Sequence, residues 1–141
     1  MTALATGAMR DTPRMGEQGT TVNLGCAAST NFKQGGMIAR DASGYATPAT
    51  AALGAIGVYR GPSFTSTATA AAENINVEGG IYRFANGTTA IDIDDIGAVF
   101  YVQDDQTLSL TSGGTMTAGG VIVNVDAVGV WGNIDILDRK S

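Results

Sequence analysis

Apolar and polar residues alternate with a period of two through much of the last third of the chain, from residue 98 to residue 136. Turns rich in Gly, Ser and Thr interrupt the alternation, and the final pair of segments closes on the residues 129–131. A period of two places successive side chains on opposite faces of an extended strand. The pattern therefore predicts short antiparallel strands joined by tight turns, with a hairpin at the C-terminal end.

The preceding residues carry shorter strand signals separated by turn residues. Residues 22–26 predict a first strand, residues 37–47 a strand–turn–strand unit, and residues 52–59 a closely packed strand. The dipeptide at 86–87, Asn-Gly, predicts a hairpin turn. Residues 65–73 fit either one short helix or a plain loop, and their threonines disfavour the helix.

About eight to ten short strands at such close spacing are typical of a small all-β domain. We expect a small β-sandwich or a partly closed β-barrel of short antiparallel strands, formed by residues 21–141 as a single β domain. Residues 1–20 show neither the helical nor the strand period, and we expect them to form an extended N-terminal arm.

The composition agrees with a β domain that is partly covered by partners. Only 15% of the residues are charged, against about 25% in typical globular domains, and 20 of the 141 residues are glycine. No apolar run approaches the 18 or so residues that span a membrane, so we expect no membrane partner.

The net charge of −5 is distributed unevenly. Residues 1–60 carry five basic and three acidic residues, for +2, and residues 61–141 carry three basic and ten acidic residues, for −7. The acidic part disfavours nucleic acid, which requires clustered Lys and Arg. The asymmetry fits either ordinary surface variation or a dipolar subunit whose N-terminal end faces an acidic partner.

Residue types for catalysis are few. The chain contains no histidine, which removes the Ser-His-Asp and Cys-His arrangements, and both of its lysines, Lys33 and Lys140, lie in polar surroundings. The single cysteine, Cys26, follows a predicted strand with no base near it in sequence, so we expect a small buried apolar residue. We predict no catalytic residue, no enzyme activity and no cofactor.

Three acidic residues form the one candidate metal site in the sequence: Asp92, Asp94 and Asp95. Hard cations such as Ca²⁺ bind several carboxylate and carbonyl oxygens. An EF-hand loop counted from Asp92 has Gly97 at position six but Gln103 at position twelve, where a Glu is required. The interpretation that we favour is a polar turn with a solvated strand face.

Trp131 has an unusual place in the alternation. Val130 and Ile134 fall on one face of the last strand, and Trp131 and Asn133 fall on the other, more polar face. A large aromatic side chain there is either packed under a loop or held at a subunit interface, where Trp is enriched. Trp131 is therefore our candidate subunit-interface residue.

The run from Gly97 to Ile136 resembles the C-terminal part of a family of tailed-phage capsid cement, or head decoration, proteins. The likeness extends over about residues 20–136. The segments that carry it are 55–59, 80–84, 97–102, 104–108, 118–126 and 129–131.

The resemblance implies a structural virion protein that binds the outer surface of a phage head and stabilises the expanded shell. It implies homotrimers, the major capsid protein as partner, no catalytic residues, synthesis in the host cytoplasm and localisation on the outer capsid surface. Spaced apolar anchors and two guanidinium groups in the arm are then the capsid-contact candidates: Leu4, Met9, Arg10, Arg14 and Met15.

Two alternatives belong to other classes. A head-fibre or tail-associated binding module would recognise a cell-surface ligand through an aromatic-lined cleft, which the dispersed tyrosines do not favour. A metal-dependent enzyme would use the carboxylates at 92–95.

Overall fold

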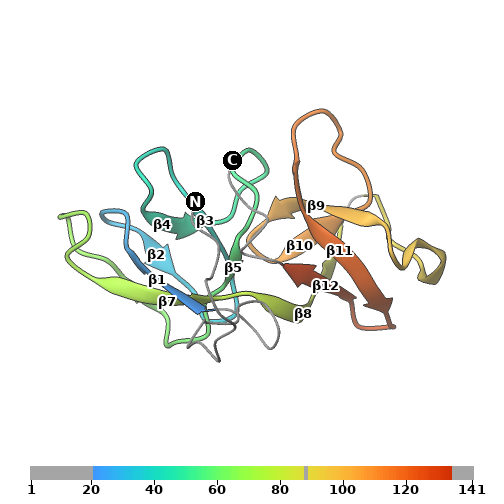
Figure 1. Cartoon of the computed structure of the whole chain (residues 1–141), viewed down its shortest axis with the longest axis horizontal. Coiled ribbons are helices and arrows are strands. Elements are labelled where there is room, and N and C mark those ends of the chain that lie inside the picture. Colours follow the sequence, from blue (N-terminus) through green and yellow to red (C-terminus); the bar gives the residue numbers. More distant parts are fainter. Residues whose placement is uncertain (1–20, 88, 135–141) are drawn as a thin grey trace, which may run out of the picture.

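Twelve strands and one short 3-10 helix make up the described part of the chain, residues 21–87 and 89–134 of the computed structural model. The prediction of an all-β fold is confirmed, and the described residues contain no α-helix. Strands β1–β7 gather in one half of the molecule and β8–β12 in the other (Figure 1). The elements are β1 Thr21–Gly25, β2 Asn31–Phe32, β3 Met37–Arg40, β4 Ala46–Pro48, β5 Gly57–Val58, β6 Phe64–Thr65, β7 Asn74–Glu78, β8 Gly80–Asn86, η1 Ile93–Asp95, β9 Val99–Asp104, β10 Thr107–Ser109, β11 Thr117–Val125 and β12 Val130–Ile134.

The N-terminal half is a five-stranded antiparallel sheet in the order β1-β7-β5-β3-β4. A parallel bridge between Cys26 and Ala46 brings the end of β1 back to β4, so the sheet is curled towards closure. Strands β2 and β6 form a separate two-stranded sheet. Its rings pack with Tyr59: Phe32 stacks on Phe64 at a centroid distance of 5.4 Å, and Tyr59 meets both edge to face.

The C-terminal half is a closed barrel in the order β10-β8-β12-β11-β9. All its pairs are antiparallel except β10 with β8. Closure removes free sheet edges, and the alternating residues predicted from the sequence fill the interior. The predicted hairpin that closes on residues 129–131 is confirmed as β11–β12. The buried interior residues are Phe84, Phe100, Val102, Leu108, Ile122, Val130 and Ile134.

The Phe100 ring occupies space that three glycines of β11 and β12 leave open. A Cβ atom on Gly132 would lie 2.7 Å from Phe100 Cε2, and one on Gly120 would lie 3.0 Å from the same atom. A Cβ atom on Gly119 would also meet the ring. Any larger residue at these places would have to displace the Phe100 ring or, at Gly120, the backbone carbonyl of Asn133 on β12 as well.

Strand β3 connects the two halves. Met37 and Ala39 belong to the hydrophobic cluster of the barrel, whereas Ile38 between them belongs to the cluster of the N-terminal half. The Met37 N–H also donates to the Asp105 carbonyl at 2.7 Å, at the turn between β9 and β10. A β-strand presents alternate residues to opposite faces, and β3 uses both faces for cores.

Two local predictions are wrong. Asn86-Gly87 does not make a hairpin turn, because β8 pairs with β12 and β10 and not with the strand that follows it. The Asn86 side-chain amide instead donates to the Ile91 carbonyl at 2.9 Å and accepts the Ile91 N–H at 2.8 Å. The predicted strand over 52–59 is reduced to β5, because a tight turn at Gly54 (φ +75°) bonds back to Thr50.

Three other expectations are met. The strand at 22–26 corresponds to β1, and the strand–turn–strand unit at 37–47 corresponds to β3–β4. Residues 65–73, left open between helix and loop, contain no helix and follow β6 as turns and bends. The predicted N-terminal arm lies outside the described residues.

Candidate functional site

Within residues 21–87 and 89–134, the large hydrophobic side chains that are exposed lie in the C-terminal half. Among the described residues, large hydrophobic side chains that are exposed occur only between positions 81 and 128. In the described part of the N-terminal half, residues 21–78, the large apolar side chains are buried or half-buried. The exposed set is Ile81, Ile93, Ile96, Val99, Val121, Val123 and Val128.

Strand register brings several of these residues together on the outside of the barrel. Val121 on β11 lies opposite Val99 on β9 and opposite Asn133 on β12. Val99 and Val121 are 46% and 42% exposed, although both stand on well-paired strands. Val123 follows on the same strand and is also exposed. β-branched residues on a strand are stabilised mainly by packing against neighbouring side chains, and these valines leave much of their surface open to such packing.

The short helix η1 extends this apolar surface. Its first residue, Ile93, is 62% exposed, and Ile96, also exposed, follows the last residue of the helix. The Gly97 N–H donates to the Ile122 carbonyl at 2.8 Å and so holds the end of η1 against β11. We call the five residues Ile93, Ile96, Val99, Val121 and Val123 the β9–β11 patch.

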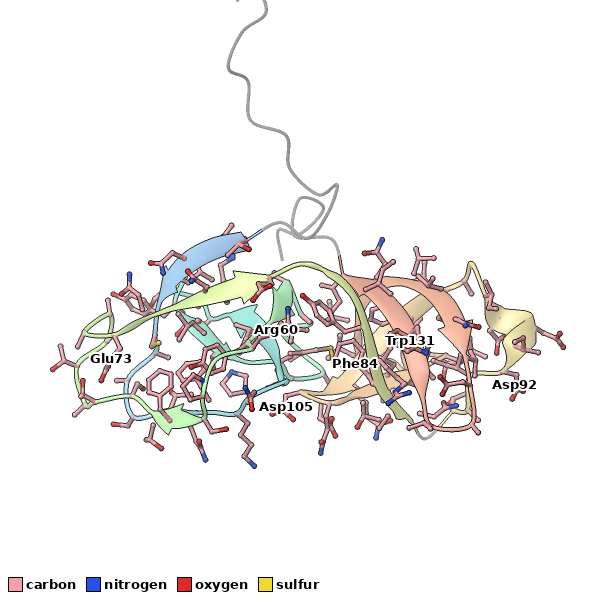
Figure 2. The ribbon with its side chains drawn as sticks, turned by 90° about the horizontal axis from the view of Figure 1, so that it is seen from below. Arg60, Glu73, Phe84, Asp92, Asp105 and Trp131 are labelled. Carbon is pink, nitrogen blue, oxygen red and sulfur yellow. The ribbon has the colours of Figure 1, made fainter. Side chains whose placement is uncertain are left out.

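The three aspartates considered as a metal site form the first turn of η1. The Asp95 carboxylate accepts the Asp92 backbone N–H at 2.7 Å, and the Asp95 N–H donates to the Asp92 carbonyl. The Asp95 carboxylate thus supplies its part of the capping box between Asp92 and Asp95, and the backbone bond closes the same turn. Within residues 21–87 and 89–134, no three acidic, Cys or His side chains lie close enough to hold a metal ion. Figure 2 shows Asp92 at the far end of the barrel and Glu73 at the opposite end of the molecule.

Trp131 is half-buried on the outer face of β12, where the alternation placed it. Its Nε1–H donates to Asp126 Oδ2 at 2.9 Å, and the Arg83 guanidinium carbon lies 5.4 Å from its ring centroid. Arg83 also approaches the same carboxylate at 3.6 Å. Contacts within the chain therefore satisfy the polar group of Trp131 and cover part of its ring. Its place at a subunit interface stays a prediction.

Asp126 is the residue of this group that the sequence reasoning missed. Its second oxygen, Oδ1, accepts the backbone N–H groups of Val128 and Gly129 at 2.8 and 2.9 Å in the β11–β12 turn. The hydrogen bond from Trp131, followed by these backbone bonds, lowers the pKa of Asp126 to about 2. An Asp at the first position of a turn and five residues before a Trp was the available signal.

An open hollow of about 320 Å³ lies beside this group. Its only aromatic lining residue, Phe84, is 6% exposed, so the ring is not available for stacking on a sugar. The hollow therefore lacks the aromatic platform that a glycan-binding module would present. It is lined by Gly35, Arg83, Phe84, Ala85, Gln106 and Val128.

Cys26 is buried, as the sequence predicted, with 1% of its surface exposed. Burial, with a smaller contribution from Glu73, raises the pKa of the thiol. A thiol with a raised pKa is a poor nucleophile at neutral pH.

Basic side chains of the N-terminal half lie apart from the apolar patch. Lys33 is exposed near β2, and Arg60 pairs with Glu78 at 3.6 Å, its side chain 63% exposed. Arg40 ends β3 and is half-buried. These three are the basic residues in the described part of the N-terminal half, residues 21–78.

The five capsid-contact candidates in the arm lie outside the described residues: Leu4, Met9, Arg10, Arg14 and Met15. Among the residues that are described, no helix has the length and apolar character needed to cross a membrane. No protein-family model, no curated protein and no solved structure matches the chain.

Proposed function

We propose that this protein is a structural subunit of a phage virion, a capsid decoration or cement protein that binds the outer surface of the head as a homotrimer. It would stabilise the expanded shell by bridging capsid subunits. The proposal begins from the resemblance of residues 97–136 to that family.

The observation that best supports the proposal is that the exposed large hydrophobic side chains, among the residues that the structure describes, gather in one half of the molecule. The β9–β11 patch places five aliphatic residues, between 39% and 62% exposed, on the pair Val99–Val121, at the irregularity of β11 that holds Val123, and on the capped turn with the residue after it. Contiguous apolar surface of this kind marks sites of protein–protein interaction. A decoration subunit requires such a surface and requires no catalytic group.

The mechanism of stabilisation would be mechanical. Each trimer would present three copies of the arm and three copies of the patch, and expansion or rupture of the shell would have to break many contacts together. Linked contacts that are individually weak become strong when they are made at once.

The test is binding to heads of the phage whose genome encodes the chain. Purified protein is mixed with expanded heads that lack it, the heads are sedimented, and the bound protein is counted per capsid subunit. We expect saturable binding at a fixed stoichiometry and a higher temperature of DNA release. Absence of saturable binding would refute the proposal.

The oligomeric state is tested separately by light scattering at micromolar concentration. We expect a trimer, or a monomer that assembles into trimers on heads. A stable dimer or tetramer would contradict the homotrimer.

A further inference from the structure

We infer that the β9–β11 patch is the docking surface for an extended segment of a partner protein that carries aliphatic side chains flanked by Lys or Arg. The inference rests on the proposed function, in which that partner is the capsid protein. It goes further by assigning the contact to five described residues and by stating the chemistry of the segment that covers them.

The patch is held in place before any partner arrives. Val99 and Val121 face each other on paired strands, and the capping box of Asp92 and Asp95 holds the turn that carries Ile93. The Gly97 bond to β11 then fixes the residue after Ile96. A surface whose residues are already ordered loses little conformational entropy when it binds.

The shape of the patch favours an extended segment. Val121 and Val123 follow each other along β11, with Val123 at the point where the β11–β12 register shifts, and the side chains on one face of an extended partner likewise follow one another along its strand. The outside of a closed barrel is convex, and the hollow beside Arg83 has no residue of the patch in its lining. An amphipathic helix would need a groove there.

Charge selects a basic partner over a second copy of the same face. Between positions 80 and 134 the sequence has one basic residue, Arg83, and six aspartates, a net charge of −5. Three of these aspartates, at 92, 94 and 95, adjoin Ile93 at the end of the patch. Two such faces placed together would bring like charges within a Debye length of about 8–10 Å, whereas Lys or Arg beside the aliphatic groups would be attracted.

The experiment compares full-length variants that change one exposed side chain each. Val121→Lys removes apolar contact from the centre of the patch and adds the charge that the partner carries. Asp94→Lys reverses a charge at its end. Ser43→Lys introduces the same charge on an exposed turn of the other half and serves as the matched control. Binding to heads, melting temperature and light scattering are measured for each.

We expect Val121→Lys to weaken binding to heads by about 10- to 100-fold, the loss that corresponds to one buried Val. Asp94→Lys should weaken it by less, and the effect should shrink at high salt. Ser43→Lys should bind as the unaltered chain does. All three should keep the unaltered melting temperature and oligomeric state.

Three results would overturn the inference. If Val121→Lys binds as tightly as the unaltered chain, the patch is not the docking surface, although the proposed function stands. If Val121→Lys changes the oligomeric state, or melts earlier than Ser43→Lys, the patch is covered by a second copy or by the N-terminal arm. If the unaltered chain does not bind heads, the inference fails together with the proposed function.

Discussion

Replacing Gly132 with alanine would place a methyl group against the Phe100 ring in the middle of the barrel. The new Cβ atom would lie 2.7 Å from Phe100 Cε2 and 3.0 Å from a methyl carbon of Leu108. Both neighbours are fully buried and have no open space to move into. Gly132 does not have a positive φ, so its backbone accepts alanine and the steric contact is the effect under test.

Two terms set the size of the effect. Overfilling a packed core costs about 1–3 kcal/mol. Alanine also restricts the unfolded chain, which stabilises the protein by about 0.4–1 kcal/mol. We therefore expect a net destabilisation of about 1–2 kcal/mol, or a melting midpoint lowered by roughly 3–8 °C in a chain of this size.

The assay is urea unfolding of Gly132→Ala, Phe100→Leu and the double variant, followed by circular dichroism. Phe100→Leu alone should destabilise the protein by leaving part of the ring volume empty. In the double variant the alanine methyl should occupy that volume. The loss of stability of the double variant should therefore be smaller than the sum of the two single losses by about 1 kcal/mol. Strict additivity, or a Gly132→Ala variant as stable as the unaltered protein, would refute the packing argument.

Three further predictions concern residues outside the barrel core. Asp126→Asn should flatten the acid side of the stability profile: the folded-state pKa of about 2 lies below the ordinary value of 3.8, so this carboxylate stabilises the fold above pH 3.8 and loses that effect as the pH falls through 2. Melting scans between pH 2 and pH 5 measure this, and profiles of equal slope would contradict it. Cys26→Ser should cost only modest stability in chemical denaturation and leave binding to heads unchanged, because the thiol is buried and has no chemical role in the proposed function; loss of binding in a folded variant would count against that function. Deleting residues 2–16 should leave the melting temperature nearly unchanged, because the β1 ladder begins with Thr21 opposite Glu78, while occupancy on heads should fall sharply; equal occupancy would show that the arm is not a docking element.

Sequence periodicity predicted the C-terminal half well because most of its strands alternate in the way that a barrel demands. Val130, Ile134 and their neighbours face in or out as the period of two requires. The N-terminal half was harder to predict. Its strands β2, β5 and β6 have two residues each, too short to show a period, and their positions depend on pairings between residues far apart in sequence.

The candidate surface illustrates the same limit. The sequence placed Val121 and Val123 in a predicted strand without assigning them to a face, and it could not show that they lie outside a closed barrel. Exposure depends on which strands pair and on how many strands close the barrel. The sequence of one strand determines neither of these. The Asn86-Gly87 dipeptide failed for a related reason, since its strand was already paired on both sides by β12 and β10.

Strand β3 has a consequence for the order in which the molecule can be assembled. Met37 and Ala39 emerge early in synthesis, yet the residues that cover them in the barrel, such as Phe100 and Ile122, are made more than sixty positions later. The nascent N-terminal half therefore exposes one face of β3 until the chain is nearly complete. Contacts of such high sequence separation form slowly. We expect β3 to be the part of the nascent chain most in need of a chaperone, and the Met37 amide, which donates to the Asp105 carbonyl, to become protected from hydrogen exchange only when the turn between β9 and β10 has formed.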